Sequence, residues 1–577
     1  MLTGTGAALV IAAVVLATVG TVAIGAYGGR GARSTSDFLV ASRSIGASWN
    51  AAAIAGEYLS AASFLGVAGL VAKYGADALW YPIGFTAGYL ALLLFVAAPL
   101  RRSGAYTVPD FAEFRLDSLR ARRVAMVVVV LVCVLYLVPQ LQGAGLTLNI
   151  LLGLPGWVGV VVVGTALIVN VVGGGMRSVT FAQAVQYWLK LTAIAVPALV
   201  AVLHFTGQPA DLGEPLPARV PVATTISVPT EVSVTVTDPV GVHVSGTVDG
   251  APVRAAPLAP GTVVVGEGST LTLAAGAATP VVSDAPQTGA AWSRSGGGLG
   301  GGHPLYQVLS LMIATFLGAL GLPHVLVRFY TNRTGADARR TALTVIVLLA
   351  AFYLFPTVLG VLSRIYVPQV LATGTSDAAV LLIPTALAGG LGGELLAALV
   401  AAGAIAAFLA TSSGLLISIA GVVSTDLLTA GVRSFRICAL IGGLIPIGLA
   451  LAAGTLELSR SVGLVFAVSA ATLCPLLVLG IWWRGLTATG AITGMAVGAF
   501  TSGFAVLAGA FWLSGDGWAT AIVTFPAAIT VPLTFATMIT VSLLTRRTLR
   551  SDVATVFARM HVPERFGLVL ERTPPGD

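Results

Sequence analysis

Apolar stretches of membrane-spanning length recur along the whole chain and exclude a water-soluble fold. A helix that crosses the hydrocarbon of a bilayer needs about 20 predominantly apolar residues. Hydrophobic residues make up 56% of the 577 and charged residues only 9%, a composition outside the range of soluble globular proteins. The sequence therefore predicts an all-α polytopic membrane protein with about 13 transmembrane helices. They are expected near residues 5–27, 47–72, 79–100, 124–150, 157–173, 179–204, 305–330, 341–367, 394–420, 437–454, 461–482, 488–512 and 519–545.

Lys and Arg residues gather in loops that fall on one side of the predicted membrane. Cytoplasmic loops of membrane proteins hold these residues in excess. With the N-terminus outside and every span retained, loops 101–123 and 328–340 and the chain from 546 onward all lie in the cytoplasm. The first span lacks the basic start of a signal peptide, so we expect it to be retained. We expect a multi-pass protein of the plasma (cell) membrane with its N-terminus outside and its C-terminus cytoplasmic.

Charge and cysteine usage argue against several classes of function. The net charge of +7 comes from basic residues spread over short loops, so nucleic-acid binding is not expected. Cys133, Cys438 and Cys474 each lie in a predicted span, too far apart in sequence for metal-ligand spacing. Neither a disulfide framework nor a transition-metal site is therefore expected. The chain has no phosphate-binding loop of the GxxxxGK[ST] type, which disfavours ATP-driven pumping. We expect a protein that is not an enzyme and that needs no cofactor.

Residues 205–304 interrupt the helical pattern between the sixth and seventh spans. Alternating runs such as 232–237 have the period of a β-strand, and the glycine-rich run 296–302 is typical of a flexible tether. A disordered loop is the alternative for this segment, and an unidentified partner of the insert stays open. The sequence predicts four parts, namely transmembrane helices 1–6 in 1–204, a small β-rich extracellular insert in 205–304, helices 7–13 in 305–550 and a cytoplasmic tail in 551–577.

The second predicted span is interrupted by polar residues at mid-depth. Residues 53–69 carry Gly56, Glu57, Ser60 and Ser63 within an otherwise apolar stretch. Each unpaired polar group in hydrocarbon costs several kcal/mol. In membrane transporters, broken helices place free backbone carbonyls and half-helix ends at an ion and substrate site near the bilayer midplane. We therefore expect this helix to unwind around a polar cargo.

The seventh predicted span carries a matching interruption. It contains Gly318, Gly321 and Pro323, and it lies five helices after the first broken span. An inverted repeat of five helices, in which each half opens with a discontinuous helix, places the substrate between the halves. The spacing of the two interruptions favours that architecture.

Four segments of the chain resemble motifs of the sodium:solute symporters. GLPHVLVRFYT, with the following Arg339 and Arg340, is most similar to the cation/acetate (monocarboxylate) symporter branch. The resemblance covers essentially all of the predicted helices and leaves the insert outside. It implies a leucine-transporter-like core, a 5+5 inverted repeat of helices two to eleven, with the first and the last two helices peripheral. The four segments are IAGEYLSAASFLG (54–66), GGGMRSVTFAQAVQ (173–186), GLPHVLVRFYT (321–331) and FLATSSGLLISIAGVVSTDLL (408–428).

The resemblance also implies a cation site between helices two and nine. Its ligands would be the backbone carbonyls of Gly56 and Leu59 on helix two, freed by the break. Helix nine would add the carbonyl of Ala407 and the hydroxyl of Thr411. Neutral carbonyl and hydroxyl oxygens suit a hard monovalent cation such as Na⁺.

Two departures from the family pattern bear on the coupling ion. Many sodium-coupled relatives have adjacent hydroxyl residues on helix nine, whereas this chain has Ala410 before Thr411, with Ser412 as a partial substitute. Gln183 stands where sugar and proline symporters carry an acid on the inner ion path. The coupling ion therefore stays open between Na⁺ and H⁺.

The same two broken helices would form the substrate site. Its candidate residues are Tyr58, Ser60 and Ser63 on helix two and Thr315 and Gly318 on helix seven. The N-terminus of a half-helix holds an anion through its free N–H groups and its dipole. Small neighbouring residues leave room but offer few hydrogen bonds, which suits a short monocarboxylate better than a sugar.

Ionisable residues within predicted spans are functional candidates by default. Glu57 is expected to accept a coupled proton or to organise the helix break. Lys190 is expected either to line the ion pathway or to extend toward the cytoplasmic interface. Arg328 is interpreted as a marker of the cytoplasmic side, with attraction of anions at the inner membrane surface as the alternative, and Asp426 as a solvated group at a helix end.

Together these features predict a secondary active symporter that imports acetate, propionate or pyruvate with Na⁺ or H⁺ by alternating access. The monocarboxylate, the coupling cation and the lipid bilayer are its expected partners. A sodium-coupled amino-acid symporter on the same scaffold is the alternative within transport. A symporter-like membrane sensor, with the insert as its binding module, is the alternative outside it.

Overall fold

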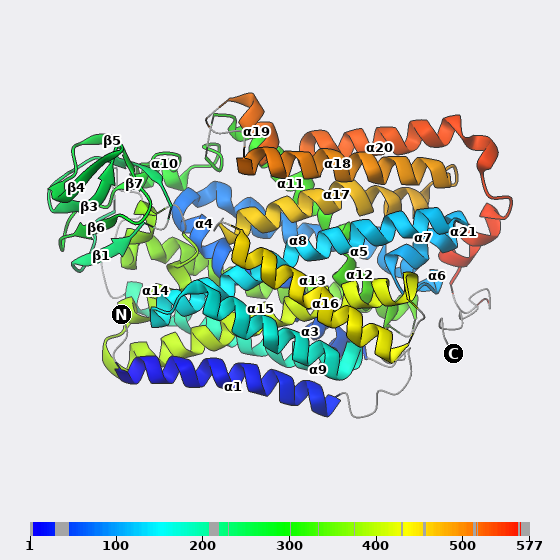
Figure 1. Cartoon of the computed structure of the whole chain (residues 1–577), viewed down its shortest axis with the longest axis horizontal. Coiled ribbons are helices and arrows are strands. Elements are labelled where there is room, and N and C mark those ends of the chain that lie inside the picture. Colours follow the sequence, from blue (N-terminus) through cyan, green and yellow to red (C-terminus); the bar gives the residue numbers. More distant parts are fainter. Residues whose placement is uncertain are drawn as a thin grey trace.

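The computed structural model is a bundle of helices that run roughly side by side, with a small β-sheet at one end (Figure 1). The described residues are 4–28, 46–206, 218–228, 230–300, 302–332, 334–373, 376–428, 431–453, 457–511, 515, 517–563 and 566. Parts of the predicted insert and the end of the predicted tail lie outside these ranges.

Within the described residues, eleven helical segments are long and apolar enough to cross a membrane, so the chain is a multi-pass membrane protein. The long helices are α1 (Gly4–Gly28), α8 (Leu119–Leu152), α9 (Gly156–Thr206), α13 (Gly335–Tyr366), α15 (Gly390–Asp426), α16 (Val432–Ala452), α17 (Leu458–Trp482), α18 (Ala488–Phe511) and α20 (Ala527–Leu544). Shorter helices are α5 (Trp80–Phe95), α6 (Ala97–Ser103), α7 (Val108–Leu116), α14 (Ala379–Leu387), α19 (Trp518–Thr524) and α21 (Val553–His561).

The structure gives eleven candidate spans where the sequence predicted about 13. The predicted spans 157–173 and 179–204 fall in one helical run, the 51-residue α9. A straight helix of that length would measure about 75 Å, more than twice the hydrocarbon thickness of about 30 Å. Gly175 interrupts the run with φ 60° and ψ −155°, a backbone conformation open essentially to glycine alone. A glycine break inside a continuous apolar run, in place of a loop, thus accounts for part of the difference.

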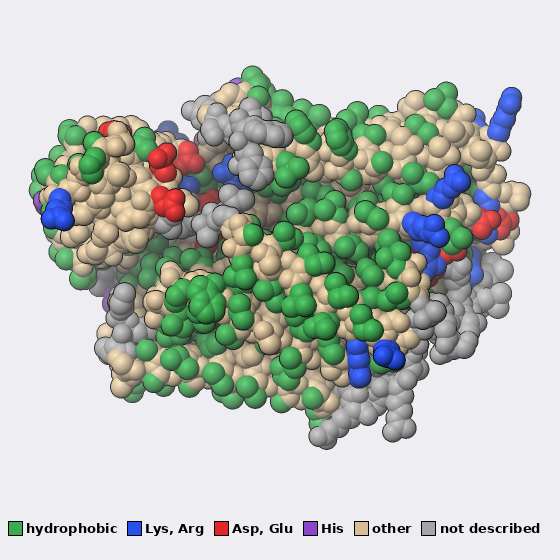
Figure 2. Space-filling view, in the orientation of Figure 1, with side chains coloured by type: hydrophobic (Ala, Val, Ile, Leu, Met, Phe, Trp, Pro, Cys, Tyr) green, Lys and Arg blue, Asp and Glu red, His purple; other side chains and the backbone are tan. Residues whose placement is uncertain are grey.

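The bundle has a buried centre and a lipid-facing periphery. Within the most apolar 18-residue stretch of each helix, 22% of the α1 residues are buried, compared with 78% for α15 and 83% for α17. On the face in Figure 2, charged side chains lie towards the ends of the molecule, and apolar side chains and backbone cover the flank between them. Such a band is what a bilayer requires, because charged groups are costly in hydrocarbon.

The first predicted interruption is present between α3 (Ala47–Tyr58) and α4 (Val67–Tyr74). Leu59, with φ −74° and ψ 89°, ends α3, and a π-helical turn at Ala62–Gly66 leads into α4. Every residue of the turn and of α4 is buried. α3 has only 12 residues, too few to cross a bilayer, so the break lies within the protein and not at its surface.

The second predicted interruption is also present, between α11 (Pro304–Gly321) and α12 (Pro323–Tyr330). Leu322 between them is extended, with φ −68° and ψ 111°. Pro323 has no N–H to donate and disfavours a helical conformation in the residue before it. A proline at the first position of α12 therefore ends one half-helix and starts the next.

The described part of the insert contains a seven-stranded antiparallel sheet. Its strand order is β1-β6-β3-β5-β2-β7, with β4 paired to β3. Inward and outward residues alternate along β2, as the sequence predicted. A disordered loop is therefore wrong for these residues. The strands are β1 (Thr224–Ser227), β2 (Val232–Val236), β3 (Val242–Val248), β4 (Ala251–Pro257), β5 (Gly261–Val265), β6 (Thr270–Leu273) and β7 (Val281–Val282).

The segment that follows the sheet is anchored on the first broken helix. The indole Nε1 of Trp292, in α10 (Gly289–Ser293), donates to the carbonyl of Val71 in α4 at 2.8 Å. The Asp77 carboxylate accepts the backbone N–H groups of Gly296, at 3.0 Å, and Gly298, at 2.7 Å. The prediction of a flexible glycine tether is therefore wrong for these two residues, because a carboxylate that accepts several N–H bonds fixes the loop.

Candidate functional site

A buried ion pair joins the two broken helices. Glu57 is the penultimate residue of α3, and Arg328 lies in α12. The Arg328 Nε donates to the Glu57 Oε2 at 2.6 Å, and both side chains are 0% exposed. Arg328 also donates to Thr180 and Gln183 on α9. Buried charges persist only when paired and hydrogen-bonded, so this pair fixes the two half-helices and α9 relative to one another.

The interpretation of Arg328 as a topology marker is wrong. Its guanidinium is enclosed by α3, α9 and α12 and does not reach a membrane surface. The signal was present in the sequence, since Arg328 falls inside the predicted span 305–330, where a charge counts as functional by default. Its partner, 271 residues away, could not be read from the pattern.

Lys190 points into the first helix break. Its Nζ donates to the carbonyl oxygen of Leu59 at 2.7 Å and also to that of Gly56. The side chain is 0% exposed, so it does not extend toward an interface. The two carbonyls are the ones that the family resemblance assigned to the coupling cation.

Helix α15 completes this cluster from the other side. The Thr411 hydroxyl donates to the Glu57 carbonyl at 2.6 Å, and the Gln183 amide donates to the Ala410 carbonyl at 2.6 Å. Ser412 and Ala407 are fully buried on the same helix, and the Ser412 hydroxyl has no hydrogen-bond partner in the described part of the chain. The structure thus brings Gly56, Leu59 and Thr411 together with Gln183 and Lys190.

The predicted substrate residues fall into two groups, those at the first helix break and those at close helix contacts of α11. The Tyr58 hydroxyl donates to the Phe85 carbonyl at 2.9 Å, and Ser63 shares a 2.9 Å hydrogen bond with the Tyr353 hydroxyl. Ser60 is buried at the break itself. Thr315 and Gly318 pack at close helix contacts, since a Cβ on Gly84 of α5 would lie 2.0 Å from the Thr315 hydroxyl. A Cβ on Gly318 would lie 2.5 Å from the Phe466 carbonyl of α17.

Three further buried polar side chains near the breaks have hydrogen-bonding atoms without partners among the described residues. They are Gln140 through Nε2, Tyr89 through its hydroxyl, and His324 through both ring nitrogens. The Gln140 Oε1 accepts the N–H of Ala61 at 2.8 Å, and the Tyr89 ring lies 4.7 Å from the Tyr58 ring. Buried polar groups are nearly always hydrogen-bonded, so these atoms are candidates for contact with a bound polar ligand. Sequence reasoning missed all three, although His324 directly follows the predicted break at Pro323.

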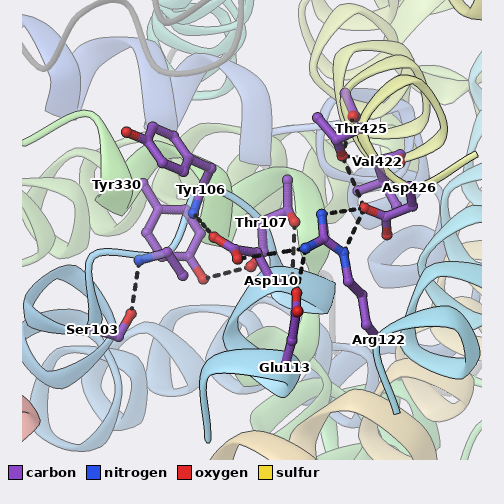
Figure 3. A network of polar contacts seen from close by, with 12 residues as sticks. Ser103, Tyr106, Thr107, Asp110, Glu113, Arg122, Tyr330, Val422, Thr425 and Asp426 are labelled. Carbon is purple, nitrogen blue, oxygen red and sulfur yellow. Dashed lines mark hydrogen bonds and ion pairs between the residues drawn. The ribbon is translucent and has the colours of Figure 1, made fainter. Parts of the chain in front are cut away.

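An ionic cluster joins α7, α8 and α15 at the end of the bundle opposite the sheet (Figure 3). Arg122 contacts the carboxylates of Glu113 and of Asp426, the latter at 2.6 Å, and lies 3.9 Å from that of Asp110. The Asp426 side chain is only 1% exposed. The prediction of a solvated helix-end group is therefore wrong, because Asp426 is the buried anchor of α15.

Replacing Arg122 by alanine is expected to destabilise the protein by about 1–3 kcal/mol. The substitution removes a cation that contacts Glu113 and Asp426 and leaves the Asp426 carboxylate buried without it. The thermal unfolding midpoint of the purified protein in detergent measures the effect. Arg123→Ala is the matched control, since Arg123 is exposed on the same turn of α8. Equal losses in both variants would show that the cluster does not hold this end together.

A second group of ionisable residues lies near the sheet end of the bundle. The Lys73 ammonium lies 3.4 Å from the Glu457 carboxylate and 3.6 Å from that of Asp284, which precedes α10. Asp377 accepts the backbone N–H of Leu458 at 2.8 Å. Burial raises the pKa of Asp377 to about 7. The ion pairs of Lys73 with Glu457 and Asp284 connect the insert to α4 and to the start of α17.

Comparison with known proteins places this architecture among transporters. The model of the sodium:solute symporter family matches residues 38–243 and 300–498. A monocarboxylic acid transporter of Corynebacterium glutamicum is 30% identical over 532 residues, 88% of this chain and 86% of that protein. The uncharacterized symporter YwcA of Bacillus subtilis is 29% identical over 495 residues, 84% of this chain and 83% of that protein.

Solved structures share the fold. A Na⁺-coupled sialic acid symporter in a substrate-bound, outward-open state aligns with a TM-score of 0.62 at 15% identity, covering 92% of this chain and 98% of that one. A nucleobase-cation-symport-1 family transporter in a closed conformation aligns with a TM-score of 0.50 at 13% identity, covering 90% and 98%. Both match this chain at the level of fold.

Proposed function

Because the chain belongs to the sodium:solute symporter family, we propose that it is a secondary active symporter for a short-chain monocarboxylate. Acetate, propionate or pyruvate enters together with a cation, Na⁺ or H⁺, by alternating access. The relative named as a monocarboxylic acid transporter supports this substrate class.

The unpartnered buried donors around the two helix breaks are the observation that carries the proposal. Within the described part of the chain, Gln140 has an unpaired amide N–H group, Tyr89 an unpaired hydroxyl and His324 an unpaired ring N–H. A carboxylate offers two oxygens with about four acceptor sites, so one small anion can satisfy several of these donors. Tyr58 lies beside these donors, since its ring packs against the rings of Tyr89 and Phe466.

The balance of buried charge also favours an anion. With all three groups ionised, Glu57 contributes one negative charge, and Arg328 and Lys190 contribute two positive charges. An isolated charge in a low-dielectric interior is costly. A bound carboxylate offsets the excess positive charge.

The placement of the first and last helices supports the expected membrane orientation. The start of α1 and the sheet lie at one end of the bundle, and α21 lies at the other (Figure 1). With basic loops in the cytoplasm, the N-terminus and the insert are extracellular. Substrate then moves from the insert end of the bundle toward the Arg122 cluster.

Uptake by the purified, full-length protein in proteoliposomes tests the proposal. With a negative-inside potential and inward Na⁺ and H⁺ gradients, labelled acetate, propionate or pyruvate is expected to accumulate saturably and to be displaced by the other two. Displacement of the label by amino acids would favour the amino-acid symporter. Absence of carboxylate uptake in every gradient would overturn the proposal.

A further inference from the structure

We propose that the Lys190 ammonium is a built-in cation that fills the predicted cation site, so that carboxylate transport by this chain does not use Na⁺ there. The observation behind this proposal is the position of the Lys190 Nζ, which lies within hydrogen-bond distance of the carbonyls of Gly56 and Leu59. The proposal rests on the proposed function only for its uptake experiment.

The carbonyl oxygens freed by the first break are already occupied. Lys190 donates to Gly56 and Leu59, and Thr411 donates to the carbonyl of Glu57 between them. An ammonium has three donors and no acceptor, and it binds oxygen at distances of about 2.7–2.9 Å. Lys190 therefore meets the same carbonyls that a hard cation would need. The carbonyl groups at the break thus have hydrogen-bond donors within the protein.

A second cation at this place is electrostatically unfavourable. Two like unit charges 4 Å apart repel by about 4 kcal/mol at an effective dielectric constant of 20. Such a penalty corresponds to a loss of affinity of about 1,000-fold. Na⁺ binding at the break would therefore require Lys190 to leave, yet the side chain is fully buried.

The charged groups that face Lys190 come from two other elements. Glu57 on α3 is the nearby anion, and its Oε2 is held by Arg328 on α12. Among the described residues of α15, the ionisable ones are Glu394 and Asp426, near its two ends and away from the break. Glu57 thus balances Arg328, and the Lys190 charge remains for the carboxylate substrate. The Lys190 ammonium thus supplies the positive charge that a bound Na⁺ would otherwise supply.

Replacing external Na⁺ by choline at constant pH and ionic strength tests the inference on the wild-type protein. Carboxylate uptake is expected to proceed at the same initial rate in both media. In detergent, the unfolding midpoint is expected to be the same in NaCl and in choline chloride. A ligand that binds only the folded state raises that midpoint, so a saturable rise specific to Na⁺ would overturn the inference. So would uptake that requires Na⁺.

Lys190→Met removes the charge and leaves two buried carbonyls unpaired. Its uptake is expected to fall about tenfold or more in either medium. Lys73→Met, which changes a lysine at the sheet end, is the matched control and should remain independent of Na⁺. Full uptake by Lys190→Met in choline, where no Na⁺ can take the place of the ammonium, would contradict the inference. If this variant does not fold, the unfolding midpoints of the wild-type protein in NaCl and in choline chloride still test whether Na⁺ binds. They also test it if no carboxylate is transported, because absence of transport would overturn only the proposed function.

Discussion

Replacing Arg328 by methionine is expected to destabilise the protein by about 3–5 kcal/mol and to abolish uptake. Methionine fills much of the volume of arginine but leaves the Glu57 carboxylate buried with its cation removed. The Glu57 Oε1 already has no hydrogen-bond partner within the described residues, so loss of Arg328 removes the one ion pair that the structure gives this carboxylate among them. The unfolding midpoint in detergent and carboxylate uptake in proteoliposomes measure the two effects. Arg340→Met, at an exposed position of α13, is the control.

A second substitution separates the stability of the pair from its part in transport. In the double variant Glu57→Leu with Arg328→Met, both charges are absent, and replacing a buried ion pair by apolar residues is often neutral or stabilising. The double variant is therefore expected to recover most of the lost stability while remaining inactive. A double-mutant cycle isolates the coupling between the two residues. Wild-type stability and uptake in Arg328→Met would show that the Glu57–Arg328 pair contributes neither to stability nor to transport.

Much of the fold follows from local signals in the sequence. The apolar runs predict the membrane helices because the bilayer imposes a minimum length on each. Pro323 marks the second break through its missing N–H, and the alternation in 232–237 predicts β2. The helix count is less accurate, because hydropathy does not distinguish a loop from a glycine such as Gly175 that bends a continuous run.

The candidate site was harder to predict because its contacts join distant parts of the chain. Glu57 and Lys190 were singled out as charges in hydrocarbon, yet their partners lie 271 and more than 130 residues away. Arg328 and Asp426 were misassigned for the same reason. Periodicity and composition describe which side of a helix is polar, and only tertiary packing decides whether that polar group meets solvent or another charge. The resemblance to a family suggested the carbonyls of Gly56 and Leu59 as cation ligands but not their contacts with Lys190.

Gly56→Ala is expected to reduce uptake about tenfold or more, although it adds a single methyl group. A Cβ at this position would lie 2.3 Å from the carbonyl oxygen of Gln183 and 3.2 Å from its carbonyl carbon. Both are backbone atoms of α9, so relief requires the two helices to move apart. Overpacking of this kind costs about 1–3 kcal/mol. The Lys190 and Arg328 contacts between α3, α9 and α12 would lengthen with the same movement.

The control for this prediction is Gly448→Ala in α16, where a Cβ would have nothing within 4 Å. Alanine favours a helix over glycine by about 1 kcal/mol, so this variant should be as stable as the wild type or more so and should transport normally. Uptake and unfolding midpoint are measured for both variants side by side. Normal uptake in Gly56→Ala would mean that α3 and α9 separate without cost. The tight approach that places the Lys190 ammonium on the Gly56 carbonyl would then have no part in transport.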